Sequence, residues 1–241
     1  MRIIITKDYD ELCQKAFEVM KEYIKPGKVL GLATGSSPVG LYKKMIEYHR
    51  NENVSFKDIT TYNLDEYVGL PITHPESYYS FMHRNLFDHV DIDESNIHIP
   101  SGLGDNLDKQ CADYEAAIEK AGVDIQLLGI GSDGHIAFNE PGTAFDSPTH
   151  ITDLAESTIK DNARFFDNDI SKVPTQAATQ GIGTIMKAKN ILLVANGTNK
   201  AQAIKDMIEG PIDEKCPASI LQKHSSVVVV IDEAAASKLS K

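Results

Sequence analysis

The chain has 241 residues, of which 41% are hydrophobic and 24% are charged, so it is long enough and apolar enough to bury a core. Its formal net charge of −11 argues against broad binding to nucleic acids or anionic membranes, which requires a basic surface. Three cysteines without a C-x-x-C pair indicate neither a disulfide framework nor a zinc knuckle, and no apolar run suits a signal peptide or a membrane span. We therefore expect a cytoplasmic protein with one domain, residues 1–241.

Short apolar segments alternate with segments of helical periodicity along the chain. Strands are predicted over residues 2–6, 28–34, 58–64, 124–131, 190–197 and 226–232, and helices over 8–23, 39–48, 77–87, 107–120 and 200–209. Apolar strands separated by helices are typical of a parallel sheet covered on both faces, so we predict a doubly wound, mostly parallel, Rossmann-like α/β fold. Ligands of such folds bind beyond the carboxyl ends of the strands, which makes the residues after each strand candidates for a site.

The segment ATGSSPVG, residues 33–40, follows the second predicted strand. Gly35 permits a tight turn, the next two serines bring hydroxyl groups, and Pro38 suits the first turn of a helix. Free backbone N–H groups and the helix dipole at such a place favour an anion such as phosphate, although no lysine follows in Walker order. An ordinary helix start capped by Ser37 explains the same residues equally well.

Charged residues follow two other predicted strands. The carboxylates of Asp65 and Glu66 come directly after the third strand, where acid–base chemistry and a solvated turn are the alternatives. Lys200 stands at a helix start after the fifth strand, where a cation opposes the helix dipole unless both bind one anion. A solvated surface lysine is the simpler alternative. Arg164, next to two phenylalanines, is a weaker candidate for an anion contact.

The segment LLGIGSDGHIAFNEPG, residues 127–142, contains G-x-G-x-x-G, the fingerprint of a dinucleotide-binding loop. Such a loop leads directly into a helix, whereas here a Pro-Gly pair follows and no helix start is evident, so we interpret the match as accidental. The segment also groups Asp133, His135 and Glu140. A carboxylate can fix the tautomer of an imidazole and raise its basicity, which suits proton transfer. A lone histidine is more often structural, but the two nearby acids favour chemistry.

Longer segments resemble the glucosamine-6-phosphate deaminase family of sugar-phosphate isomerases. They are NLDEYVGLPITHPESYYSFM, GSDGHIAFNEPG, ARFFDND and VPTQAATQGIGTIM, and they occur in the family's order from about the second strand to the last helix. The resemblance implies the doubly wound fold and an enzyme that uses no metal or cofactor. It implies the conversion of glucosamine 6-phosphate and water into fructose 6-phosphate and ammonia.

The resemblance also implies a role for individual residues. Asp65 would move a proton between C2 and C1 of the sugar, and His135, assisted by Asp133 and Glu140, would open the pyranose ring. The residues implied in phosphate binding are Thr34, Gly35, Ser36, Ser37, Arg164 and Lys200.

Three other readings compete with this one. A phosphogluconolactonase would need no enolising base such as Asp65. A sugar-phosphate sensor would need a DNA-binding segment, for which neither terminus has room. An oxidoreductase would have to bind NAD(P).

Some longer family members are activated by N-acetylglucosamine 6-phosphate through an arginine and a lysine after the Asn-Glu-Pro segment. His150 and Thr152 stand there in this chain, so we expect no such activation. A homo-oligomer is left open.

Overall fold

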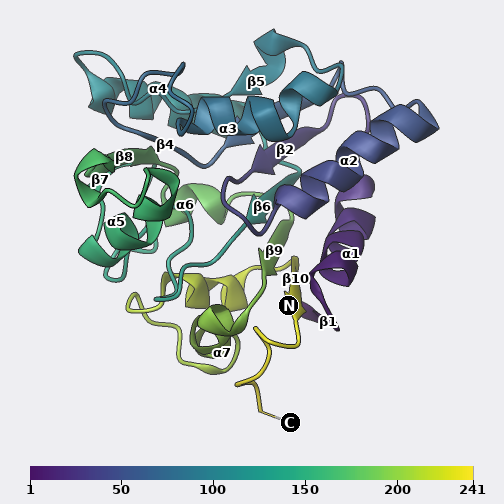
Figure 1. The fold of residues 1–241 in the computed structure, drawn as a ribbon, viewed down its shortest axis with the longest axis vertical. Coiled ribbons are helices and arrows are strands. Elements are labelled where there is room, and N and C mark those ends of the chain that lie inside the picture. Colours follow the sequence, from purple (N-terminus) through teal and green to yellow (C-terminus); the bar gives the residue numbers. More distant parts are fainter. Residues whose placement is uncertain (241) are drawn as a thin grey trace.

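The computed structural model describes residues 1–240, which form two sheets and seven α-helices. The strands are β1 (Arg2–Thr6), β2 (Val29–Leu32), β3 (Thr60–Asn63), β4 (Asp65–Tyr67), β5 (Ile97–His98), β6 (Ile125–Leu128), β7 (His150–Asp153), β8 (Gln176–Thr179), β9 (Ile191–Ala195) and β10 (Val227–Asp232). The helices are α1 (Tyr9–Lys21), α2 (Val39–Glu52), α3 (Tyr78–Asn85), α4 (Leu107–Ala121), α5 (Glu156–Asn162), α6 (Ile182–Ile185) and α7 (Ala201–Glu209). Figure 1 shows α1 and α2 to one side of the main strands and the small sheet with α5 to the other.

The main sheet has seven strands in the order β1-β10-β9-β6-β2-β3-β5, and every pair is parallel. From β2 the chain proceeds through β3 to β5 at one edge, and from β6 it proceeds through β9 to β10 toward the other. The direction of winding therefore reverses between β2 and β6, which is where ligands bind in doubly wound folds. The helix-covered parallel sheet confirms the predicted α/β class.

The packing of α1 illustrates how the sequence produces this layer. Leu12, Ala16 and Met20 recur every four residues, so they lie on one face of the helix and are completely buried in the core. The side chain of Asp8 accepts a hydrogen bond from the N–H of Glu11 and caps the helix. The buried face of α1 packs against β1, β9, β10 and α2.

A second, smaller sheet was not expected from the sequence. Its strands pair antiparallel in the order β4-β8-β7, with Asp65 opposite Thr179. Beside this sheet, the rings of Tyr67, Phe138 and Phe166 lie within a separate apolar cluster. The solvated turn that was one alternative for Asp65 is therefore wrong, because this buried residue opens strand β4, with only Leu64 between it and the end of β3.

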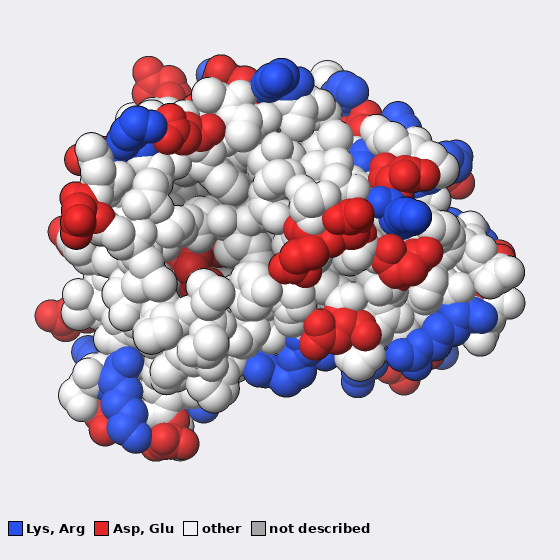
Figure 2. Space-filling model, turned by 90° about the horizontal axis from the view of Figure 1, so that it is seen from above, with Lys and Arg blue, Asp and Glu red and all other residues white. Residues whose placement is uncertain are grey.

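The described residues contain no helix that is both long and apolar enough to cross a membrane. On the face seen in Figure 2, acidic and basic side chains are interspersed around a hollow in the surface.

Candidate active site

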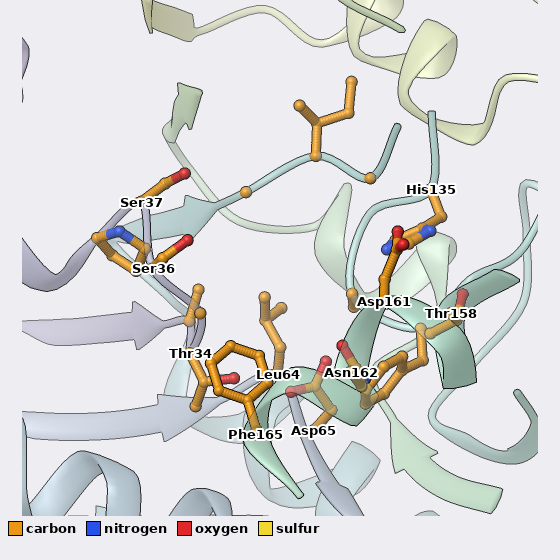
Figure 3. Close-up of a pocket in the computed structure, with 18 of the residues that line it drawn as sticks. Thr34, Ser36, Ser37, Leu64, Asp65, His135, Thr158, Asp161, Asn162 and Phe165 are labelled. Atoms are coloured by element: carbon orange, nitrogen blue, oxygen red, sulfur yellow. The ribbon is translucent and has the colours of Figure 1, made fainter. Parts of the chain in front are cut away.

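One cavity of about 390 Å³ opens at the carboxyl ends of four neighbouring strands, β9, β6, β2 and β3. The loops that follow these strands line it together with residues of α5 and the segment after it. Of the predicted site residues, those that line the cavity are Thr34, Gly35, Ser36, Ser37, Asp65, His135, Arg164 and Lys200. Asp133 and Glu140 contact the imidazole of His135. Figure 3 shows the Thr34–Ser37 segment on one side of the cavity and His135 on the opposite side.

Asp65 and Glu66 are both buried, but they have different surroundings. Burial, aided by the charge of Glu66 and opposed by that of His135, raises the pKa of Asp65 to about 8. The carboxylate of Glu66 turns away and accepts hydrogen bonds from the N–H groups of Tyr67, Tyr78 and Tyr79 at 2.8–2.9 Å. Glu66 thus anchors the start of α3, while Asp65 faces the cavity.

The imidazole of His135 lies between two carboxylates. Its Nδ1 is 2.8 Å from Oδ1 of Asp133 and 3.5 Å from Oε2 of Glu140, which leaves Nε2 to exchange a proton with a ligand. Glu140 is itself held by the hydroxyl of Thr158, which donates to Oε1 at 2.6 Å. Burial disfavours the charged ring, but the two carboxylates outweigh it and raise the pKa of His135 to about 9. The pKa of Asp133 falls to about 2, because its bonds to His135 outweigh its burial.

Two glycines of the G-x-G-x-x-G segment shape the loop that carries His135. A side chain at Gly131 would collide with the ring of His135, and Gly134 has a φ of +88° and packs against Cys216. In the described chain no helix begins between Gly134 and β7. This loop lacks the helix N-terminus that a dinucleotide pyrophosphate would need.

The cavity also contains groups that can bind an anion. Helix α2 begins after Pro38 without a side-chain cap, and the hydroxyl of Ser37 instead donates to Oδ1 of Asn196 at 2.9 Å. The alternative that Ser37 caps this helix is therefore wrong. Burial lowers the pKa of Lys200, with the charge of Arg164 acting in the same direction and that of Asp161 against it. A dianion bound near Arg164 and Lys200 would favour the charged form of Lys200, because its negative charge opposes both the effect of burial and the repulsion by Arg164.

Several residues around the cavity were missed by the sequence reasoning. Thr158, Asp161 and Asn162 line it from α5, a helix that was not predicted. Tyr78 lines it from the start of α3, and Asn196 from the loop after β9. The position of Asn196 directly after a strand was a signal that could have found it, whereas α5 follows no strand of the main sheet.

Asp133, His135 and Glu140 are also the one group of potential metal ligands among residues 1–240, with their ligand atoms within 4.8 Å of one another. Nδ1 of His135 lies within ion-pair distance of both acids, although it and Oε2 of Glu140 are buried and make no hydrogen bond of good geometry.

Comparison with known proteins defines the class of this fold and site. The model of the family described as glucosamine-6-phosphate isomerases/6-phosphogluconolactonase matches residues 8–230, and the chain belongs to this family. The structure of a 6-phosphogluconolactonase from Trypanosoma brucei has a TM-score of 0.78 over 99% of this chain and 98% of that one, but only 19% identity, so this likeness concerns the fold alone.

Closer relatives carry the name of one member of this family. The glucosamine-6-phosphate deaminase of Thermoanaerobacter sp. (strain X514) is 49% identical over 240 residues, which are 98% of this chain and 94% of the relative. That of Clostridioides difficile (strain 630) is 48% identical over 243 residues, 100% of this chain and 97% of the relative. A solved structure described as a monomeric glucosamine-6-phosphate deaminase has a TM-score of 0.96 and 48% identity, and covers 98% of this chain and 99% of that one.

Proposed function

We propose that this protein is a glucosamine-6-phosphate deaminase, which converts glucosamine 6-phosphate and water into fructose 6-phosphate and ammonia. The observation that carries the proposal is the content of a single cavity: a buried carboxyl group, an imidazole paired with carboxylates, and two cationic side chains, Arg164 and Lys200. Near-50% identity to deaminases over almost the whole chain supports the same reaction.

In this proposal the phosphate lies at the loop Gly35–Ser37, between Arg164 and Lys200. As the bond between C1 and the ring oxygen breaks, the charged imidazole of His135 donates a proton to that oxygen and then takes up the proton of the C1 hydroxyl, so that C1 becomes an aldehyde. Asp133 and Glu140 hold the imidazole in place. Charge-assisted hydrogen bonds to a phosphate contribute roughly 1.5–3 kcal/mol each, so this loop supplies much of the substrate affinity.

Asp65 then carries out the isomerisation. Its carboxylate removes the proton from C2 of the open chain and returns it to C1, while one proton of the C2 ammonium group passes to the carbonyl oxygen O1. The aldehyde thereby becomes a primary alcohol, and C2 becomes an iminium carbon. Water adds to C2, ammonia leaves together with a proton, and the ketose remains. A carboxyl with a pKa of about 8 is a stronger base than an ordinary aspartate, and the substrate ammonium on C2 favours its ionised form.

We propose that activity does not require a homo-oligomer, which the description of a 48% identical deaminase as monomeric supports. We also propose a cytoplasmic location, which the three free cysteines support.

Ammonia release tests the proposal directly. The purified protein should release ammonia from glucosamine 6-phosphate without any added cofactor, and unphosphorylated glucosamine should be a very poor substrate. The second candidate, lactone hydrolysis, is measured in parallel with 6-phosphogluconolactone. Lactone hydrolysis without ammonia release would refute the deaminase, and comparable efficiency on glucosamine would refute the phosphate site.

A further inference from the structure

The backbone of the loop Ser36–Ser37 is held from outside the cavity by a tyrosine of helix α1. The hydroxyl of Tyr9 lies 3.1 Å from the carbonyl oxygen of Ser36 and 2.9 Å from that of Ser37, and it accepts a hydrogen bond from the N–H of Gly40 at 3.0 Å. Tyr9 therefore replaces the side-chain cap that α2 lacks.

The direction of these carbonyl groups determines where the neighbouring N–H group points. In a planar trans peptide the C=O and N–H groups point in opposite directions. The Ser36 carbonyl points to Tyr9, which is not among the residues that line the cavity, whereas Ser36 and Ser37 are. The N–H of Ser37 therefore points away from Tyr9, toward the cavity. The Ser37 carbonyl precedes Pro38, which has no N–H to orient.

We propose that Tyr9 is a positioning residue for phosphate binding, which acts by holding the Ser36–Ser37 peptide so that the Ser37 N–H can donate to the anion. This inference rests on the proposed function, which places the substrate phosphate at this loop. Tyr9 itself does not touch the substrate.

Two further features fit this role. Partial burial raises the pKa of Tyr9 to about 12, so its hydroxyl keeps the proton that it donates to the carbonyls. Gly40 lies against Tyr9 and Cys13: a Cβ on Gly40 would collide with the sulfur of Cys13 and lie 3.1 Å from the Tyr9 oxygen. Helix α2 thus has a glycine, the poorest helix former after proline, at the point where Tyr9 approaches it.

The variant Tyr9→Phe keeps the ring and removes only the hydroxyl. We expect the Kd for inorganic phosphate, measured by calorimetry, to rise about tenfold, and the KM for glucosamine 6-phosphate to rise to a similar extent. The kcat should stay within about twofold, because the lost interaction holds the substrate equally in the ground and transition states. Tyr48→Phe, on the neighbouring helix α2, is the matched control and should leave both constants unchanged.

Gly40→Ala provides a second route to the same effect. It leaves the Tyr9 hydroxyl in the chain, but the new Cβ would collide with the sulfur of Cys13 and crowd the Tyr9 oxygen at 3.1 Å, so α1 and Tyr9 must shift relative to the loop and the phosphate Kd should rise here as well. Thermal unfolding of each variant shows whether the fold is retained.

The inference is overturned if Tyr9→Phe binds phosphate as tightly as the wild type, if kcat falls while the phosphate Kd is unchanged, or if the wild type does not bind phosphate at millimolar concentration. A wild type that binds phosphate but releases no ammonia refutes the proposed reaction instead. In that case the comparison of phosphate affinities still decides the role of Tyr9.

Discussion

Asp65 and Glu66 show how adjacent residues of one type acquire different tasks. Both are buried, but Glu66 accepts three backbone hydrogen bonds, which oppose the effect of burial on its pKa. For Asp65, only the charge of His135 opposes the effect of burial, and the pKa of Asp65 still reaches about 8. A carboxylate already engaged by amide groups is a poor base, so these surroundings support our proposal that Asp65, and not Glu66, transfers the proton.

Replacement of Asp65 by asparagine tests this assignment. Asp65→Asn should fold normally but lose deamination by about 10²–10⁴-fold or more, since the amide cannot accept the C2 proton. It should equally lose the exchange of the substrate C2 proton with solvent deuterium, observed by NMR. The control Glu66→Gln should retain this exchange. Exchange that persists in Asp65→Asn would mean that another group is the base.

The charge of His135 depends on its carboxylate neighbours and can be followed through pH. The raised pKa of His135, about 9, keeps the ring charged at neutral pH. Asp133→Asn removes one of the carboxylates that stabilise this charge, so the pKa of His135 should fall. The proton donor is then lost at lower pH, and the alkaline limb of kcat/KM should move down by about one unit. An alkaline limb that stays in place in Asp133→Asn would exclude His135 as its origin.

At the scale of elements, the sequence predicts those strands that a local run of apolar residues marks. Each of the six strands inferred from apolar runs exists in the main sheet: the run Val227–Asp232 is buried in its interior, whereas β1 lies at its edge and is largely exposed. The small sheet escaped prediction because its strands, DEY, HITD and QAAT, contain no apolar run and are defined only by their pairing with one another. Strand β5, with two residues, is shorter still.

The site residues that could be predicted are those that directly follow a strand of the main sheet. The loops after β2, β3, β6 and β9 were recognised individually, but only the strand order makes these four strands neighbours and brings their loops to one cavity. No local pattern encodes that order. The contribution of α5 was hidden for the same reason, because Thr158 and Asp161 reach the cavity through tertiary packing.

Strand β7 bears on regulation, since it contains His150 and Thr152. Neither residue carries a fixed positive charge for a second phosphate, and Asp153 follows in the same strand. An effector without differential affinity for two states shifts no equilibrium. We expect a hyperbolic rate curve in glucosamine 6-phosphate, with a half-saturation point that N-acetylglucosamine 6-phosphate alters only by weak competition. A sigmoidal curve that the effector makes hyperbolic would show an allosteric site built from other residues.

At the scale of the whole molecule, the buried acid of the site has a cost in stability. An aspartate in the unfolded chain ionises near pH 4, whereas folded Asp65 retains its proton to about pH 8. The unfolded state therefore binds fewer protons in this range, and the contribution of Asp65 to stability, present below pH 4, is lost as the pH rises through 8. His135 acts in the same direction, because its raised pKa favours the folded state below its ordinary value and this advantage disappears as the pH rises through about 9.

Asp65→Asn removes the first of these two contributions and keeps the second. Because one pKa unit corresponds to about 1.4 kcal/mol, the wild type should lose about 2 kcal/mol of unfolding free energy relative to this variant between pH 6 and pH 8. Urea unfolding of both proteins at a series of pH values measures the difference. Asp93→Asn is the control: its exposed carboxyl has a lowered pKa through bonds to Ser95, so it stays ionised over this range and its curve should parallel the wild type. Parallel curves for Asp65→Asn and wild type would mean that Asp65 is already ionised in the folded protein, and that its strength as a base must arise only when the substrate binds.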